Sequence, residues 1–310
     1  MKTRVLPLLL MPLLLCGCTD IRTRRSPDFL AADIGDSIRL AAHATQSDEI
    51  ITAETDAIPL LPEALQNASG AEVSPGHISL LLIHGEPCTL LETALEQQWL
   101  PPTAAVLCLP ESACDALRDG SAPDADRLTA AAETGQLPRR TADTVLGDLL
   151  NGSGITAFPA EDHGRLTLLL RDRAQAYGTL SENACRGLAL LGNRWKQFRF
   201  PCGESVCTVR KASLKISVTA QDGRLRITVS GKILADTDAP ETAAQLLTGM
   251  LSAALHETAR DTGADVLFLR EYAVRGRIRA AVTCAPAEWA AVLRHAEYRT
   301  EITVSQTGSG

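Results

Sequence analysis

The sequence predicts an α+β or mixed α/β protein of more than one domain, in which mixed sheets are flanked by helices. Between residues 29 and 158, short apolar runs alternate with segments whose apolar residues recur at helical spacing. Further on, two stretches of alternating apolar and polar residues flank Asp222-Gly223, a pattern typical of an antiparallel hairpin. A long amphipathic segment follows that hairpin. The C-terminal part is therefore expected to be an α+β domain with an antiparallel hairpin and a long helix.

The composition excludes several classes of protein. The chain has 310 residues, of which 45% are hydrophobic and 22% charged, so it can bury a sizeable core and is neither disordered nor collagen-like. Its 37 acidic and 30 basic residues give a net charge of −7, and the isoelectric point is near 5.4. This balance argues against a nucleic-acid partner, because neutralising phosphates requires a basic surface. Only the N-terminal apolar run approaches membrane length, which excludes a polytopic membrane protein.

The N-terminal segment resembles a bacterial lipoprotein signal. Lys2 and Arg4 precede an apolar run over residues 6–15 that is too short to span a bilayer. The run closes with a leucine, a small residue, Gly17 and Cys18. In such signals, cleavage occurs just before the cysteine, whose thiol takes a diacylglycerol. We therefore predict lipid attachment at Cys18 and a membrane-anchored protein on the extracytoplasmic face, since several acyl chains give stable anchoring. The alternatives are an ordinary secretory peptide or a short membrane anchor.

These observations divide the chain into four parts. We expect a signal peptide over 1–17 and a lipidated tether over 18–28. An N-terminal mixed α/β region, which could comprise two subdomains, should cover 29–158, and a C-terminal α+β domain should cover 159–310.

Individual elements of the N-terminal region follow from local patterns. Helical spacing of apolar residues over 60–68 predicts a helix that Gly70 ends. Continuous apolar runs over 78–83 and 104–109 predict strands that are covered on both faces. Thr141 is placed to cap a further helix.

The C-terminal domain shows a similar set of signals. The apolar run over 188–191 predicts a strand. Asp238 and Glu241 have the spacing of a capping box at the start of the long helix. A helix over 286–296 and a strand around 302–304 should complete the domain.

Residues that could carry chemistry are sparse. The six histidines are scattered, and none belongs to a zinc-binding motif. They are His43, His77, His84, His163, His256 and His295. No nucleophile elbow, phosphate-binding loop or dinucleotide fingerprint is present. The sequence therefore predicts no catalytic residues, no metal and no cofactor.

Two cysteines form the one suggestive pair. Cys202 and Cys207 are separated by four residues just before the hairpin, so they could close a small disulfide loop outside the cytoplasm. The alternative is that both thiols are unpaired, and a metal site would require a second cysteine pair, which is missing.

Several stretches together resemble the Ger(x)C family of spore germination lipoproteins, the C subunits of nutrient germinant receptors. The likeness runs along most of the chain. It lies in Gly17-Cys18-Thr19-Asp20, Gly76-His77 followed by an apolar run, Gly187-Leu188-Ala189-Leu190-Leu191, Asn193-Arg194-Trp195, Ala264-Asp265-Val266-Leu267-Phe268, Glu288-Trp289 and Ile302-Thr303-Val304. The segment Ala32-Asp33-Ile34-Gly35-Asp36 departs from the family's usual order.

The resemblance implies a membrane-tethered, three-domain mixed α/β protein without catalytic residues. It implies the two integral membrane subunits of A and B type as partners, the spore inner membrane as the location, and a role in the germination response. Trp195, Phe198 and Phe200 either anchor a partner or pack in the core. The alternative function is that of a solute-binding or hydrolytic lipoprotein of the cell envelope.

Overall fold

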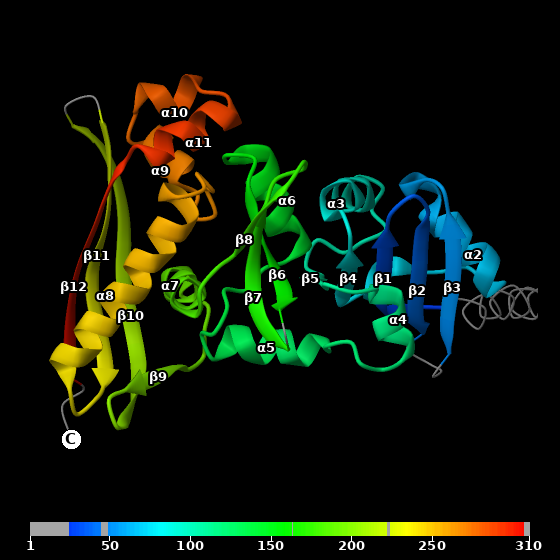
Figure 1. Ribbon diagram of the computed structural model, residues 1–310, viewed down its shortest axis with the longest axis horizontal. Helices are drawn as coiled ribbons and strands as arrows, with labels where there is room; N and C mark the ends of the chain where they lie inside the picture. The colour runs from blue at the N-terminus through cyan, green and yellow to red at the C-terminus, as the bar shows by residue number, and fades with distance from the viewer. Residues whose placement is uncertain (1–24, 45–48, 163, 222–223, 307–310) are drawn as a thin grey trace, which may run out of the picture.

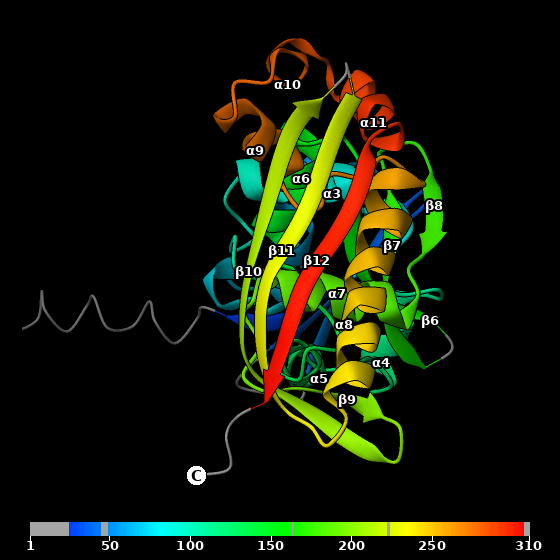
Figure 2. The same cartoon turned by 90° about the vertical axis from the view of Figure 1, so that its left-hand side faces the viewer.

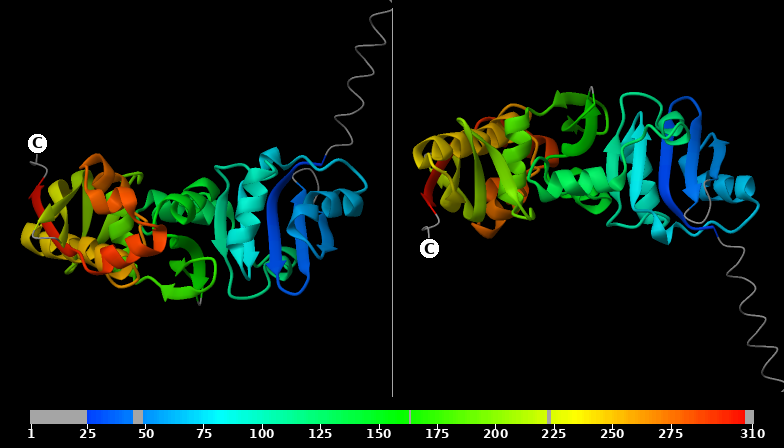
Figure 3. Two further views of the ribbon diagram at one scale, coloured as in Figure 1. Left: turned by 90° about the horizontal axis from the view of Figure 1, so that it is seen from above. Right: turned by 90° about the horizontal axis from the view of Figure 1, so that it is seen from below.

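The computed structural model describes residues 25–44, 49–162, 164–221 and 224–306. The described residues form two β-sheets, one of eight strands and one of four, with helices packed on both. Figures 1 and 3 show an elongated molecule with β1 near one end of its long axis and the smaller sheet at the other end. Mixed sheets flanked by helices are the fold class that the sequence predicts. No helix within these ranges is long and apolar enough to cross a membrane.

The first sheet has the strand order β3-β2-β1-β4-β5-β6-β7-β8. The central strands β1, β4, β5 and β6 are parallel, and antiparallel pairs extend the sheet on both sides. The strands are β1 (Pro27–Ile34), β2 (Ile38–Ala44), β3 (Ile50–Thr55), β4 (Leu80–His84), β5 (Ala105–Cys108), β6 (Thr156–Asp162), β7 (Arg165–Arg171) and β8 (Ala176–Thr179). The apolar runs over 78–83 and 104–109 thus form central strands, as predicted.

Helices cover both faces of this sheet. They are α2 (Leu61–Ser69), α3 (Pro87–Glu96), α4 (Ala113–Arg118), α5 (Ala125–Glu133) and α6 (Ala142–Asn151). One face packs in a core with α2, α3 and α6, and the other with α4 and α5. Two of the predicted helix ends are confirmed. Gly70 ends α2 in the left-handed conformation with φ +63°, and Thr141 is the N-cap of α6.

The second sheet has the order β12-β11-β10-β9. Its strands are β9 (Phe198–Cys202), β10 (Ser205–Gln221), β11 (Arg224–Asp236) and β12 (Glu297–Gln306). The predicted hairpin is confirmed by the antiparallel register of β10 and β11, although Asp222-Gly223 itself lies outside the described residues. One face packs on α8 (Pro240–Leu255), and no helix of the described residues passes in front of the other face in Figure 2.

Four further helical segments complete this half of the molecule. They are α7 (Glu182–Gly192), α9 (Leu269–Arg275), α10 (Arg279–Thr283) and α11 (Pro286–Arg294). A π-helical turn, His256–Arg260, extends α8. The predicted helix around Trp289 is α11, and Trp289 itself is fully buried.

The strand predicted over 188–191 is wrong, because these residues lie in α7. Ser181 caps this helix by accepting a hydrogen bond from the Ala184 backbone N–H. The apolar run reflects burial on several sides, since Leu190 packs with the second sheet and Leu188 with β6 and β7. At Gly187, a Cβ atom would lie 2.1 Å from the Met250 carbonyl oxygen, so α7 and α8 approach backbone to backbone.

The capping box predicted at Asp238 is also wrong. The N-cap of α8 is Ala239, which forms no side-chain cap, and Pro240 occupies the first helical position. Proline suits this position because its fixed φ is helical and its missing N–H would have no partner there.

Two of the expected boundaries fall within folded structure. The expected division between residues 158 and 159 falls inside β6, and the first sheet continues to β8. The last residues of the expected tether are part of the fold, because the Arg25 N–H donates to the Glu72 carbonyl and β1 begins at Pro27. The signal peptide and Cys18 lie outside the described residues.

Candidate functional site: a cleft beside the first sheet

The cysteines predicted as a possible disulfide lie next to each other on the second sheet. Cys202 is opposite Ser205, and Cys207 is opposite Phe200, so the two thiols occupy diagonal positions on one face of β9 and β10. Both are buried and both are free thiols in the structure. Burial raises the pKa of Cys207 to about 11, which keeps its thiol protonated at neutral pH. The disulfide stays a prediction.

The structure brings together a different set of residues, at two adjoining cavities. The larger has a volume of about 770 Å³ and is bounded by the amino ends of β4 and β5 and by α5. The smaller, of about 430 Å³, lies between α7, β10 and the start of α9. Both are lined by the segment 137–140 and by Arg194, which therefore stand where the two cavities meet. Volumes of this size are ordinary for small-molecule sites.

A buried ion pair fixes one side of this junction. The Arg140 guanidinium pairs with Asp148 of α6 and donates to the Thr156 hydroxyl at 3.0 Å and to the Ala157 carbonyl at 3.1 Å. Burial raises the pKa of Asp148, and the Arg140 charge opposes that shift. Because Arg140 is anchored inward, the preceding Arg139 is left exposed, and it has no hydrogen-bond or ionic partner among the described residues.

The other side of the junction is the turn after α7. Asn193 ends that helix in the left-handed conformation, with φ +50°, and Arg194 follows it into solvent. Lys196 then ties the turn to α5, because its ammonium lies 2.6 Å from a carboxylate oxygen of Glu133 and its backbone N–H donates to the Glu133 carbonyl. Like Arg139, Arg194 has no ionic partner within the part of the chain that the structure describes.

Aromatic and aliphatic side chains line the smaller cavity. Trp195 is half-buried and contacts Phe198 edge to face, with ring centroids 5.7 Å apart. Phe268, which directly precedes α9, and Tyr272 within α9 also line this cavity, and they are 40% and 37% exposed. Phe198, like Phe200, is fully buried in the core. Of the three aromatics considered as partner anchors, only Trp195 therefore reaches a cavity wall.

A buried carboxylate holds Phe268 in place. Asp265 accepts hydrogen bonds from the backbone N–H groups of Leu269 and Arg270, at 2.5 and 2.9 Å, and from the Trp289 indole at 2.8 Å. Burial raises the pKa of Asp265. These bonds cap α9 while Phe268 adopts φ +56°, a conformation that is costly for a bulky residue. The stretch 264–268 and Trp289, noted separately in the sequence, thus meet in one structural centre.

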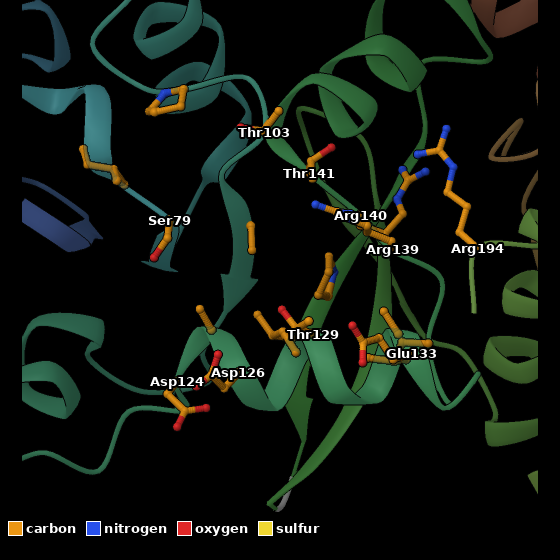
Figure 4. Close-up of a pocket in the computed structure, with 18 of the residues that line it drawn as sticks. Ser79, Thr103, Asp124, Asp126, Thr129, Glu133, Arg139, Arg140, Thr141 and Arg194 are labelled. Atoms are coloured by element: carbon orange, nitrogen blue, oxygen red, sulfur yellow. The ribbon is translucent and has the colours of Figure 1, made fainter. Parts of the chain in front are cut away.

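Charge is distributed unevenly along the cleft. Asp124, Asp126 and Glu133 lie along one side of the larger cavity, away from the guanidinium groups of Arg139 and Arg194 (Figure 4). The smaller cavity has no carboxylate among its lining residues as the structure describes them. The chemistry that such a site supports is recognition of an anion with an apolar part. Sequence reasoning missed this site, because Arg139 and Arg194 come from segments that no motif connects.

The described residues contain no group of three or more His, Cys, Asp or Glu side chains that could hold a metal ion. His163, one of the six histidines considered above, lies outside the described ranges.

Comparison with known proteins gives one informative likeness. No protein-family model and no curated protein matches the chain. Among solved structures, the crystal structure of the GerBC protein matches with a TM-score of 0.57 and 11% sequence identity, over 90% of this chain and 97% of that chain. This likeness confirms the Ger(x)C-type fold that the sequence motifs suggest. At this identity it shows the fold alone.

Proposed function

We propose that this protein is a non-enzymatic, lipid-anchored subunit of a spore nutrient germinant receptor, needed for the germination response. One observation carries the proposal: a fold shared with the GerBC protein over nearly the whole of both chains. The order of the motifs in the sequence supports it independently, because the lipoprotein-like start at Cys18 and the C-terminal stretches both resemble the Ger(x)C family.

In this proposal, a diacylglycerol on Cys18 anchors the chain to the outer face of the spore inner membrane. The anchor would connect to the body through β1, which begins at Pro27. The second sheet lies at the opposite end of the long axis and so would extend away from the attachment point (Figure 3). The C-terminal domain would then contact the A and B type subunits at a distance from the anchor, through parts of those subunits that reach it.

The uncovered face of the second sheet is a candidate docking surface. Residues that share this face alternate with the buried residues along β10, β11 and β12. Its charged side chains on these strands are Lys211, Lys215, Arg224, Arg226, Lys232, Arg299, Asp236, Glu297 and Glu301. Basic groups thus predominate here in a chain whose net charge is −7, which favours a partner with an acidic surface.

Deletion of the gene in a sporulating host tests the receptor role. We expect spores to lose the response to at least one amino acid or sugar in a nutrient panel while still germinating by a route that bypasses nutrient receptors. Normal germination with every nutrient, in a host without a redundant paralogue, would contradict the proposal.

Replacement of the lipidated cysteine tests the anchor separately. In the Cys18→Ala variant, we expect the protein to leave the membrane fraction, because the acyl chains supply the hydrophobic attachment. Mass spectrometry of the mature wild-type N-terminus should show the added diacylglycerol. A Cys16→Ala variant is the matched control and should remain membrane-bound, since Cys16 would be removed with the signal peptide. Full retention of the Cys18→Ala variant would overturn the anchoring claim.

A further inference from the structure

We propose that the smaller cavity binds a small organic anion, one that carries a carboxylate on a flat apolar body. The inference rests on the cavity beside α7, β10 and α9, and it holds independently of the receptor role. It assigns Arg139 and Arg194 to the anion and the walls formed by Trp195, Phe268 and Tyr272 to the apolar body.

The cations at this cavity are available to a ligand. Arg139 and Arg194 line it from two different segments, and neither forms an ion pair or hydrogen bond with another described residue. The third arginine, Arg140, is already neutralised by Asp148. A guanidinium group presents paired N–H donors that match the two oxygens of a carboxylate. No carboxylate is among the described residues that line the smaller cavity, and Glu133 of the larger cavity pairs with Lys196, so the two guanidinium groups remain the complement of an anion in a protein of net charge −7.

The walls of the cavity select the rest of the ligand. Trp195, Ile216, Leu267 and Phe268 form apolar walls of this cavity, whose whole volume is about 430 Å³. The exposed aromatic ring of Phe268 is held there by a backbone with φ +56°, although a bulky residue normally avoids this region. Strained residues of this kind persist where the surrounding structure holds them in place, and they cluster at ligand sites. The hydrogen bonds of Asp265 to Leu269 and Arg270 supply that support.

The two cavities together fix the direction of the ligand. Asp124, Asp126 and Glu133 line the larger cavity and disfavour an anion there. The carboxylate should therefore lie at the junction, against Arg139 and Arg194. The apolar body should extend into the smaller cavity, between Trp195 and Phe268.

Titration calorimetry with the full-length chain in a nonionic detergent tests this assignment, with 3-phenylpropionate as the probe. Two compounds dissect its chemistry: 3-phenylpropylamine has a similar body with the opposite charge, and propionate has the carboxylate without the ring. We expect saturable binding of 3-phenylpropionate that weakens in high salt, no binding of the amine, and propionate binding weaker by at least roughly tenfold. Failure of the wild-type chain to bind the probe, or equal binding of the amine, would overturn the proposal.

Variants locate the binding within the molecule. Arg139→Gln and Arg194→Gln should each weaken binding by roughly tenfold, because each removes a charged hydrogen-bond donor. Phe268→Gly should also weaken it, and this variant should fold well because glycine accepts the positive φ. Arg224→Gln, at an exposed arginine on β11, is the matched control and should bind as the wild type does. Melting temperatures of all variants report whether they are folded. Wild-type affinity in both arginine variants would refute the assignment.

Discussion

The two sheets differ in how many of their faces are covered, and this difference decides what each strand tolerates. In the first sheet, adjacent residues of β4 enter two different cores. Leu81 packs with α3 and α6, whereas Leu82 packs with α4 on the other face, and both are fully buried. In β11 of the second sheet, Ile227 is fully buried, but its neighbour Thr228 lies on the uncovered face beside Arg299. A strand with two covered faces accepts a polar side chain only where hydrogen bonds satisfy it, as Asp148 satisfies Thr156 of β6, whereas a strand with one covered face has a polar position at every second residue.

The largest effect should come from a charge placed in β4. We expect Leu81→Glu and Leu82→Glu each to lower the free energy of unfolding by more than about 4 kcal/mol, because each buries an unpaired carboxylate and removes a packed side chain. Chemical denaturation monitored by circular dichroism measures this. If either variant retains wild-type stability, the face toward which that residue points is not covered, and the contrast between the sheets fails on that side.

Replacing Arg140 tests how much the buried ion pair with Asp148 stabilises the part of the molecule that surrounds the first sheet. Arg140→Ala leaves the Asp148 carboxylate, whose side chain is fully buried, without its counter-ion. We expect a loss of about 3 kcal/mol at neutral pH, since breaking a buried pair leaves an uncompensated charge. A Lys196→Ala variant is the control, because the pair that Lys196 forms with Glu133 is exposed and should contribute less than about 1 kcal/mol.

The loss in Arg140→Ala should depend on pH in a defined direction. Burial already raises the pKa of Asp148, and removing the Arg140 charge should raise it further. A folded state that holds its proton more tightly than the unfolded state gains stability as the pH falls. The deficit relative to wild type should therefore shrink between pH 7 and about pH 4, where the carboxyl becomes protonated in both states. A deficit that grows on acidification would contradict this account.

The same contrast explains which elements the sequence could predict. Strands covered on both faces give continuous apolar runs, and β4 and β5 were found in that way. The hairpin of β10 and β11 was found through its alternation, because one face is open. The rule failed at α7, where a helix packed between the two halves of the molecule also gives a continuous apolar run, and periodicity alone cannot distinguish the two. Two features of the sequence favour a helix here: the apolar pattern extends over the 11 residues Glu182–Gly192, and Ser181 is a good N-cap residue.

The candidate site was harder to predict because it depends on tertiary structure. Arg139 is available because its neighbour Arg140 is held by Asp148, and Arg194 because Asn193 turns the chain at the end of α7. Neither fact has a local pattern. The motif at 264–268 was visible in the sequence, but its connection to Trp289 through Asp265 was not, since the two lie on separate elements.

The smallest effect should come from the same charge placed on the uncovered face. Thr228→Glu should change the free energy of unfolding by no more than about 0.5 kcal/mol, because the side chain remains in solvent near Arg299. Its neighbour Ile227 provides the matched control, and Ile227→Glu should be as damaging as the β4 variants, since that side chain is fully buried. If Thr228→Glu were strongly destabilising, another part of the chain would have to cover this face, and the surface proposed for docking would already be occupied. A neutral result would leave the basic face open to a partner and would allow charge reversal there to be used without unfolding the domain.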